Sequence, residues 1–233
     1  MDSTRSPDIA LNDLRALGPL PIAAKQRLLR KAVRHAVAAG TVLFEQGSMP
    51  TFQHIVLAGS AHLFARGGDQ REVLIEVVQP GDLVIPAAVV TNSPYLMQAR
   101  VLEPSRFLLI EAETFRAAIR QEPAVAQAMI ASLAGQFRRM VRQIKNLKLR
   151  SSAERVAGYI LALSRAQKRP DRVVLPYEKN LIASELGMTR ENFSRTLGAL
   201  QSDGISVQGD TILIRDAERL AAVSGIDPLV DEM

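Results

Sequence analysis

Residues 179–198 read KNLIASELGMTRENFSRTLG, and this window decides the fold of the C-terminal part of the chain. A helix-turn-helix of this length needs a small residue at its fifth position, where the second helix crosses, and favours glycine at its ninth, where the first helix ends. Ala183 and Gly187 occupy these two positions. The positions that interdigitate between the helices are apolar, with Thr196 as the only weak fit: Ile182, Leu186, Met188 and Phe193. The window therefore predicts two crossing helices joined by a tight turn.

The second predicted helix begins with polar residues that are suited to reading DNA bases. Thr189 is a natural N-cap for this helix. Glu191, Ser194 and Arg195 are spaced i, i+3 and i+4, so they project from one face near the end that enters a major groove. Arginine bridges O6 and N7 of guanine, glutamate accepts from N4 of cytosine, and serine is small enough to meet a thymine edge or a phosphate. Arg190 is placed to take a phosphate or a further base. The alternative is an ion pair between Glu191 and Arg195 on a solvated surface.

The residues around this window predict a winged domain over residues 151–233. A helix is expected over residues 153–166, followed by a proline-containing connection over residues 169–176. After the second helix, residues 204–214 alternate apolar side chains on either side of Gln208-Gly209-Asp210. This alternation predicts a two-stranded ribbon, or wing.

Residues 123–150 predict one long helix with an apolar seam. Apolar residues recur at alternating gaps of four and three: Ala126, Ile130, Leu133, Phe137, Met140, Ile144 and Leu147. Basic residues such as Arg138 and Lys145 lie off the seam. A heptad seam of this length favours a dimerisation helix in a homodimer. The alternative is a helix that lies on the rest of its own chain.

Residues 1–122 predict an all-β sensor domain behind an N-terminal helix. Between residues 40 and 110, short apolar runs recur about every eight to twelve residues with glycine-bearing turns between them, as in a β-sandwich or roll. Gly67-Gly68-Asp69 is a plausible hairpin turn between strands over residues 61–65 and 72–78. A helix is expected over residues 22–33. The expected fold class is therefore α+β, with a β-roll, a long helix and a winged helix-turn-helix.

Composition excludes several classes of site. The 233 residues are 47% hydrophobic and contain no cysteine, so the chain has no disulfide, no thiolate zinc site and no cysteine-ligated iron–sulfur cluster. One long charge-free stretch, residues 83–99, is broken by two prolines and predicts no membrane segment. The N-terminus shows no secretory signal, and a cytoplasmic protein is expected.

The net charge of +5 is unevenly distributed. Residues 138–200 carry 14 Lys and Arg against 5 Asp and Glu, a balance of +9, which leaves −4 for the remainder. A basic C-terminal half favours a polyanionic partner, because neutralising phosphates releases condensed counterions. A solvated basic helix face is the alternative interpretation.

Four stretches, in this order of domains, resemble the CRP/FNR superfamily of bacterial transcription regulators: GTVLFEQG at 40–47, LAGS at 57–60, PGD at 80–82 and LGMTRENFSR at 186–195. The resemblance covers about residues 20–220. It implies a jelly roll like that of cyclic-nucleotide-binding domains, a homodimer on double-stranded DNA, and RNA polymerase as a partner. Glu191, Ser194 and Arg195 match the reading motif of the FNR-like branch, which implies inverted TTGA-type half-sites. Arg190 matches an arginine of the cAMP-responsive branch and leaves the outer base preference open.

The sensor half departs from the cyclic-nucleotide binders of this superfamily. Where they carry a Gly-Glu pair and an Arg-Ser/Thr-Ala run, this chain has Ile85-Pro86 and Met97-Gln98-Ala99. Pro86 cannot accept a ribose hydroxyl, and Met97 cannot neutralise a buried phosphate. We therefore expect no cAMP. Pro86, Met97, Gln98 and Arg100 remain a candidate effector pocket, although strand alternation turns Arg100 away from Met97.

Without cysteine, the chain resembles the nitric-oxide-responsive or nitrogen-oxide-linked regulators of the superfamily, some of which are thought to use haem. His54 and His62, in strands on either side of Gly59, are candidate axial ligands, although each is also explained as an ordinary strand histidine. A roll that binds no effector is a further alternative, and the effector stays open.

Two other classes of function are weaker interpretations. A cupin-like metalloenzyme requires a His-x-His pair with a further Glu and His, whereas this chain has three scattered histidines. An adaptor whose roll binds an acidic protein would leave the basic half solvated. Neither explains the helix-turn-helix window, and we expect no enzyme.

Overall fold

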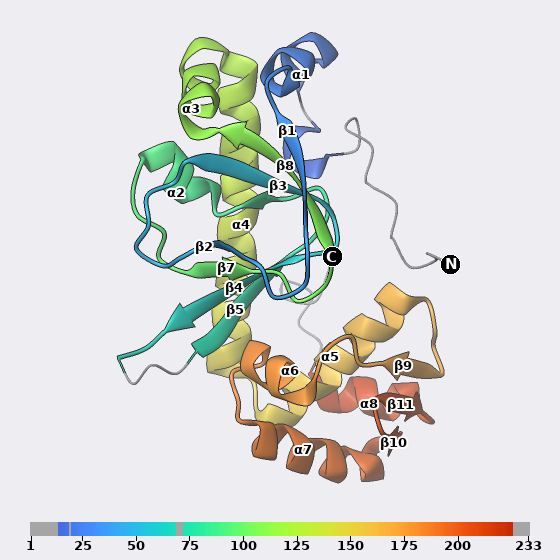
Figure 1. Cartoon of the computed structure of the whole chain (residues 1–233). Coiled ribbons are helices and arrows are strands. Elements are labelled where there is room, and N and C mark those ends of the chain that lie inside the picture. The colour runs from blue at the N-terminus through green and yellow to red at the C-terminus, as the bar shows by residue number, and fades with distance from the viewer. Residues whose placement is uncertain (1–13, 19, 69–71, 226–233) are drawn as a thin grey trace, which may run out of the picture. The chain divides into compact units, whose positions relative to one another are not determined.

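The computed structural model describes residues 14–18, 20–68 and 72–225, and the chain divides into two compact units, residues 1–136 and 137–233. The division falls inside one helix, α4 (Pro123–Leu149), so the first unit holds the start of α4 and the second holds its end (Figure 1). Each unit buries its own hydrophobic core.

The first unit is a roll of two four-stranded antiparallel sheets, as the spacing of apolar runs predicts. The first sheet has the order β1 (Val33–Val37), β8 (Ser105–Glu111), β3 (Phe52–Ala58), β6 (Leu83–Val84). The second has the order β2 (Val42–Phe44), β7 (Gln98–Arg100), β4 (Ala61–Arg66), β5 (Glu72–Val78). Between the sheets, Val56 and Phe107 of the first pack with Leu63 and Ala99 of the second, and all four are buried.

Helices cover the other face of the first sheet. These are α1 (Ile22–Leu29), α3 (Ala112–Gln121) and the start of α4, with α1 and α3 side by side (Figure 1). Val125, Ala128 and Met129 of α4 join Ile55 and Ile110 of the sheet in one core. A short 3-10 helix at Arg15–Leu17 adds Leu17 to the same core.

The structure corrects the expectation of a helix over residues 22–33. Helix α1 ends at Leu29, and Val33 already begins β1, which pairs with β8 from Val33 opposite Leu109 to Val37 opposite Ser105. After Leu29 the helical pattern of the sequence is weak, and pairing of β1 along the edge of the sheet outweighs it. Helices α2 (Pro86–Thr91) and α3 have no counterpart in the sequence predictions. Strands β4 and β5 pair as the hairpin predicts, and Asp69 of its turn lies outside the described residues.

The second unit is a winged helix-turn-helix. Its elements are α5 (Ser152–Gln167), β9 (Arg172–Val174), α6 (Lys179–Glu185), α7 (Arg190–Ala199), a 3-10 turn (Leu200–Asp203), β10 (Ile205–Gln208), β11 (Thr211–Ile214) and α8 (Ala217–Ser224). The predicted ribbon is β10 and β11, and β9, in the stretch taken for a connection, adds a third strand beside β11. Val156, Phe193 and Ile212 meet in its core. No helix among the described residues combines the length and the apolar character needed to cross a membrane.

Candidate nucleic-acid interface and sensor roll

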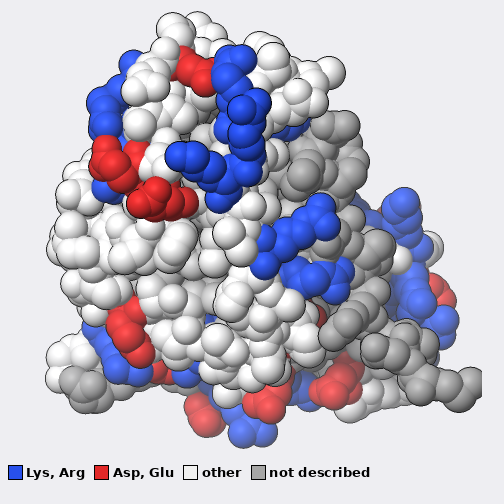
Figure 2. Space-filling model, turned by 45° about the horizontal axis from the view of Figure 1, so that its top comes forward, with Lys and Arg blue, Asp and Glu red and all other residues white. Residues whose placement is uncertain are grey.

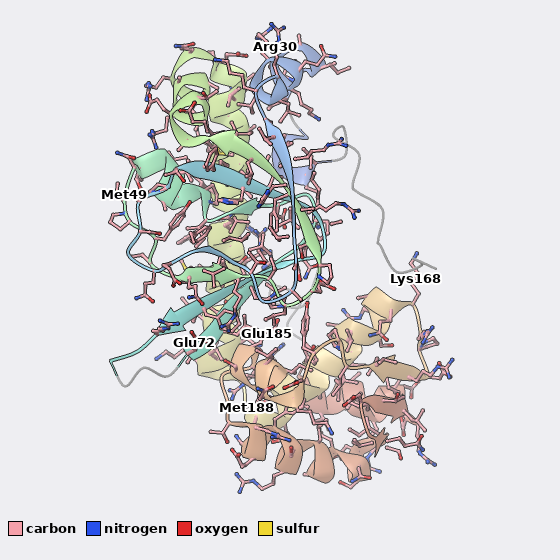
Figure 3. All side chains as sticks on the ribbon, in the orientation of Figure 1. Arg30, Met49, Glu72, Lys168, Glu185 and Met188 are labelled. Atoms are coloured by element: carbon pink, nitrogen blue, oxygen red, sulfur yellow. The ribbon has the colours of Figure 1, made fainter. Side chains whose placement is uncertain are left out.

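The turn between α6 and α7 has the geometry that the sequence window predicts. Ala183 is fully buried where α7 crosses α6, and Gly187 ends α6 with a φ of +63°. The N–H of Met188 donates to the carbonyl of Ala183 at 2.9 Å and closes the turn, at the position of the labelled Met188 side chain in Figure 3. Only glycine adopts such a left-handed conformation without a steric penalty.

Helix α7 buries one face and exposes the other. Phe193 and Leu197 are buried in the core of the second unit. Glu191, Ser194 and Arg195 are exposed, so the structure brings the three proposed reading residues to one accessible face. Because a buried aromatic anchors the helix from behind, this face is presented on a rigid element.

The start of α7 is fixed by its cap. The hydroxyl of Thr189 accepts the N–H of Asn192 at 3.2 Å, as expected for an N-cap, and such a bond is worth about 1 kcal/mol. Thr189 and Arg190 are both exposed at this end. The start of the helix and exposed polar side chains therefore lie together, which suits a phosphate backbone.

One residue of this site has no counterpart in the sequence predictions. The Asn192 side chain accepts from Nη2 of Arg195 at 3.4 Å and donates from Nδ2 to the hydroxyl of Ser152 at 3.2 Å. Its position three residues before Arg195 was visible in the sequence, but its contact with α5 depends on tertiary packing. Asn192 thus connects a proposed reading residue with the start of another helix.

The seam of α4 is left uncovered in the single chain. Ile130 is 68% exposed and Phe137 60% exposed, although both are large apolar residues. Met140, Ile144 and Leu147 are exposed as well, and Leu133 is half-buried. Val125, Ala128 and Met129, on another face of α4, already pack against the roll. The exposed seam residues are therefore not needed to hold α4 on the roll.

Positive charge is not confined to α7. Lys168, which ends α5 in a left-handed conformation, lies at the far end of the second unit from α7 (Figure 3), and Arg165 and Arg169 are its exposed neighbours. Figure 2, in which the top of Figure 1 is turned forward, shows further groups of basic side chains on that face, with acidic side chains beside some of them. Because basic side chains also lie away from α7, positive charge alone does not locate a DNA interface, and sequence-specific binding requires base contacts as well.

The four residues of the candidate effector pocket do not converge. Pro86 is buried at the start of α2, after Ile85 at a φ of +40°, and Met97 packs on the core between the sheets. Gln98 and Arg100 point to the other face of β7, because the intervening Ala99 lies in that core. Gln98 donates from Nε2 to Glu45 Oε2 at 2.5 Å, and Arg100 donates from Nη2 to Glu72 Oε2 at 3.1 Å.

Arg100 is further engaged by an aromatic ring. Its guanidinium carbon lies 4.5 Å from the centroid of the Phe64 ring, a cation–π distance. The same guanidinium group helps to hold the pKa of Glu72 below its usual value, after the larger contribution of the hydrogen bond from Arg66. This arginine is committed to partners within the sheet.

The two candidate histidine ligands lie in different sheets. His54, in β3, faces the space between the sheets, 5.5 Å from the Phe44 ring and 6.3 Å from the Phe107 ring, centroid to centroid. Burial lowers the pKa of His54 to about 4 and also lowers the pKa of His62, in β4. The part of the chain that the structure describes contains no cluster of three His, Cys, Asp or Glu residues that suits a metal ion.

Comparison with known proteins matches each unit to a family model. Residues 34–122 match the cyclic nucleotide-binding domain, and residues 154–223 match the Crp-like helix-turn-helix domain. The chain is 25% identical over 187 residues to a CRP-like cAMP-activated global transcriptional regulator of Mycobacterium tuberculosis, covering 78% of this chain and 84% of that one. It is 29% identical over 197 residues to the fumarate and nitrate reduction regulatory protein of Salmonella typhi, covering 81% and 77%.

Among solved structures, FixK2 from Bradyrhizobium japonicum superposes with a TM-score of 0.71. At 20% identity, over 84% of this chain and 98% of FixK2, this likeness shows the fold. The two relatives above differ in what their names describe, one by cAMP activation and the other by the control of fumarate and nitrate reduction.

Proposed function

Because the chain belongs to the CRP/FNR family of DNA-binding transcriptional regulators, which are not enzymes, we propose that it binds inverted TTGA-type half-sites as a homodimer. The observation that carries this proposal is the exposed face of α7, where Glu191, Ser194 and Arg195 stand together above a buried Phe193. Arg195 reads a guanine through O6 and N7, Glu191 accepts from a cytosine amino group, and Ser194 meets a thymine edge or a phosphate. Thr189 and Arg190 add contacts at the start of the helix.

The dimer is proposed to form along α4, over residues 123–150, between a sensor roll (residues 1–122) and a DNA-binding domain (residues 151–233). The uncovered apolar side chains of Ile130, Phe137 and Ile144 support a partner helix, because leaving them in water forfeits about 1.5–3 kcal/mol for each large side chain. A two-fold axis along this seam would repeat α7 on a second half-site, as an inverted repeat requires. The DNA-bound dimer then acts on RNA polymerase in the cytoplasm.

The effector is proposed not to be cAMP. A cyclic phosphate buried in the roll needs a cation, and the candidate pocket offers Pro86 and Met97. Arg100, the basic residue nearest to them in sequence, is paired with Glu72 on the opposite face of β7. The residues present therefore do not fit the phosphate of a cyclic nucleotide.

Haem is supported only in part by the residues of the roll. Among the described residues, the buried Nδ1 of His54 has no hydrogen-bond partner, and aromatic rings lie beside the imidazole, which are properties of an axial ligand in apolar surroundings. His62 lies in the other sheet and does not join it. The proposed assignment is therefore a single candidate ligand, His54, which would hold the iron through an imidazole nitrogen.

The experiment that tests the function is a fluorescence-anisotropy titration of the full chain. One duplex carries two inverted TTGA half-sites, and a matched duplex has both half-sites scrambled at the same length and composition. We expect the inverted site to bind at least a hundredfold more tightly at 150 mM salt, with a stoichiometry of two chains per duplex. Equal affinity for both duplexes would overturn the proposal, and no binding to either would favour the adaptor.

A further inference from the structure

We propose that Asn192 is a positioning residue for DNA reading, which sets the direction of Arg195 and fixes the start of α7 on the start of α5. This inference rests on the proposed function of α7. Asn192 is half-buried, whereas Glu191, Ser194 and Arg195 are exposed, so its own side chain is not the one offered to the bases. It acts through its neighbours.

Three hydrogen bonds meet at Asn192. Its backbone N–H donates to Thr189 Oγ1 at 3.2 Å, its Oδ1 accepts from Arg195 Nη2 at 3.4 Å, and its Nδ2 donates to Ser152 Oγ at 3.2 Å. The first bond belongs to the helix cap, and the second orients the guanidinium group. The third leaves α7 altogether and joins the first residue of α5. An amide side chain suits this place because it donates and accepts at the same time.

Ser152 is held rigidly, and this makes it a useful anchor. Ser151 caps α5 by accepting the N–H of Glu154 at 3.3 Å, while Glu154 Oε2 accepts the N–H of Ser151 at 2.6 Å. Arg155 donates to the carbonyl of Arg150 at 2.7 Å across the same junction. The hydrogen bond between Ser152 and Asn192 therefore fixes α7, the proposed recognition helix, relative to the segment that directly follows α4.

The physical benefit of such a link is a smaller entropic loss when DNA is read. A free arginine side chain carries about 2 kcal/mol of rotamer entropy, part of which is lost when its fork engages a base. A guanidinium group that Asn192 already directs loses less rotamer entropy on binding. This gain in binding free energy applies only to duplexes in which the guanidinium group contacts its guanine. Removing Asn192 should therefore reduce discrimination between sequences more than it reduces affinity for DNA in general.

The test compares two duplexes with each variant of the full chain. One carries inverted TTGA half-sites, and the other has the G·C pair of each half-site replaced by A·T. The dissociation constant for the substituted duplex divided by that for the TTGA duplex measures discrimination at the guanine. We expect N192A to lower this ratio about threefold to tenfold, with affinity for a scrambled duplex unchanged within twofold. A merely structural role would instead lower the melting temperature and weaken both duplexes alike.

Three further variants sharpen the result. S152A should lower the ratio in the same direction. S202A should leave it unchanged, because within the described part of the chain the Ser202 hydroxyl bonds to the carbonyl of Ala199 and to the adjacent Asp203. In the double variant N192A/S152A, the serine change should add nothing, because its partner is already gone. N192D keeps an acceptor for Arg195 and for the Ser152 hydroxyl, so it should retain the ratio while a new negative charge weakens all sequences.

The two proposals fail in different ways. If the parent chain discriminates at the guanine and N192A discriminates equally well, the positioning role is overturned and the proposed function stands. If the parent chain itself shows no discrimination, both are overturned. A loss in N192A that N192D does not restore would also contradict the hydrogen-bonded geometry.

Discussion

The Cδ2 methyl group of Leu147 occupies the space beside Gly187 where a Cβ atom would stand. Gly187 forms the turn between α6 and α7, and Leu147 belongs to the apolar seam of α4. One side chain therefore contacts the turn of the helix-turn-helix from the end of the proposed dimerisation helix. A movement of this end of α4 would therefore be transmitted to the turn before α7 through the contact between Leu147 and Gly187.

Replacing Gly187 with alanine should cost more stability than the backbone conformation alone explains. Gly209, in the wing, has nearly the same φ of +62° but open space around it, so G209A is a matched control. We expect G209A to lose about 1 kcal/mol from left-handed strain and G187A to lose about 2 kcal/mol, because its new methyl group also forces the partly exposed Leu147 side chain to move. Urea unfolding measures both.

The double variant G187A/L147A should recover part of that loss, since the smaller side chain leaves room for the methyl group. Equal losses for G187A and G209A would show that the contact between Leu147 and Gly187 carries no energy.

Charges on the seam of α4 should separate the dimer. F137E and I144E each place a carboxylate at a position where a partner helix would bury it, and an unpaired buried charge is strongly unfavourable. We expect monomers that no longer bind the inverted site, because each half-site contributes through the shared dimer. A131E, at an exposed position of α4 off the seam, should remain dimeric. Analytical ultracentrifugation at micromolar concentration distinguishes these outcomes, and an intact F137E dimer would contradict the seam.

In the protein without haem, acid should destabilise the roll through His54. Its pKa is lowered to about 4 by burial, whereas an unfolded chain titrates it near 6.5. Below pH 6.5 the unfolded state therefore binds the proton first, and the stabilisation of the fold by neutral His54 is lost as the pH falls towards 4. The full effect is roughly 3 kcal/mol.

Urea unfolding of the parent chain and of H54Q at pH 7.5, 6 and 5 measures this contribution. The parent should lose stability faster than the variant over this range. Identical pH slopes for the two proteins would mean that His54 does not titrate as its burial implies.

The helix-turn-helix and the long helix were predictable from the sequence, because their patterns depend on local geometry. Ala183 and Gly187 satisfy constraints within a twenty-residue window, and the seam of α4 repeats over three heptads. The strands β4 and β5 were predictable for the same reason, with a Gly-rich turn between two apolar runs.

The features that escaped prediction depend on contacts between distant segments. Strand β1 forms because β8 offers it a pairing edge, and β9 joins the wing because β11 does the same. The bond between Asn192 and Ser152 joins residues 40 positions apart, and the contact between Leu147 and Gly187 crosses a similar separation. The separation of Met97 from Arg100 followed from strand alternation, but the partners that occupy Arg100 did not.

The proposed reading of bases by α7 is tested most directly by R195A in a base-substitution scan of the inverted half-site. Dissociation constants are measured for the parent chain, for R195A and for R165A, an exposed arginine near the far end of α5. R195A should lose about 1–3 kcal/mol of binding to the intact site and become indifferent to one guanine in each half-site, whereas R165A should affect all sequences alike. Full discrimination at every base by R195A would contradict the assignment.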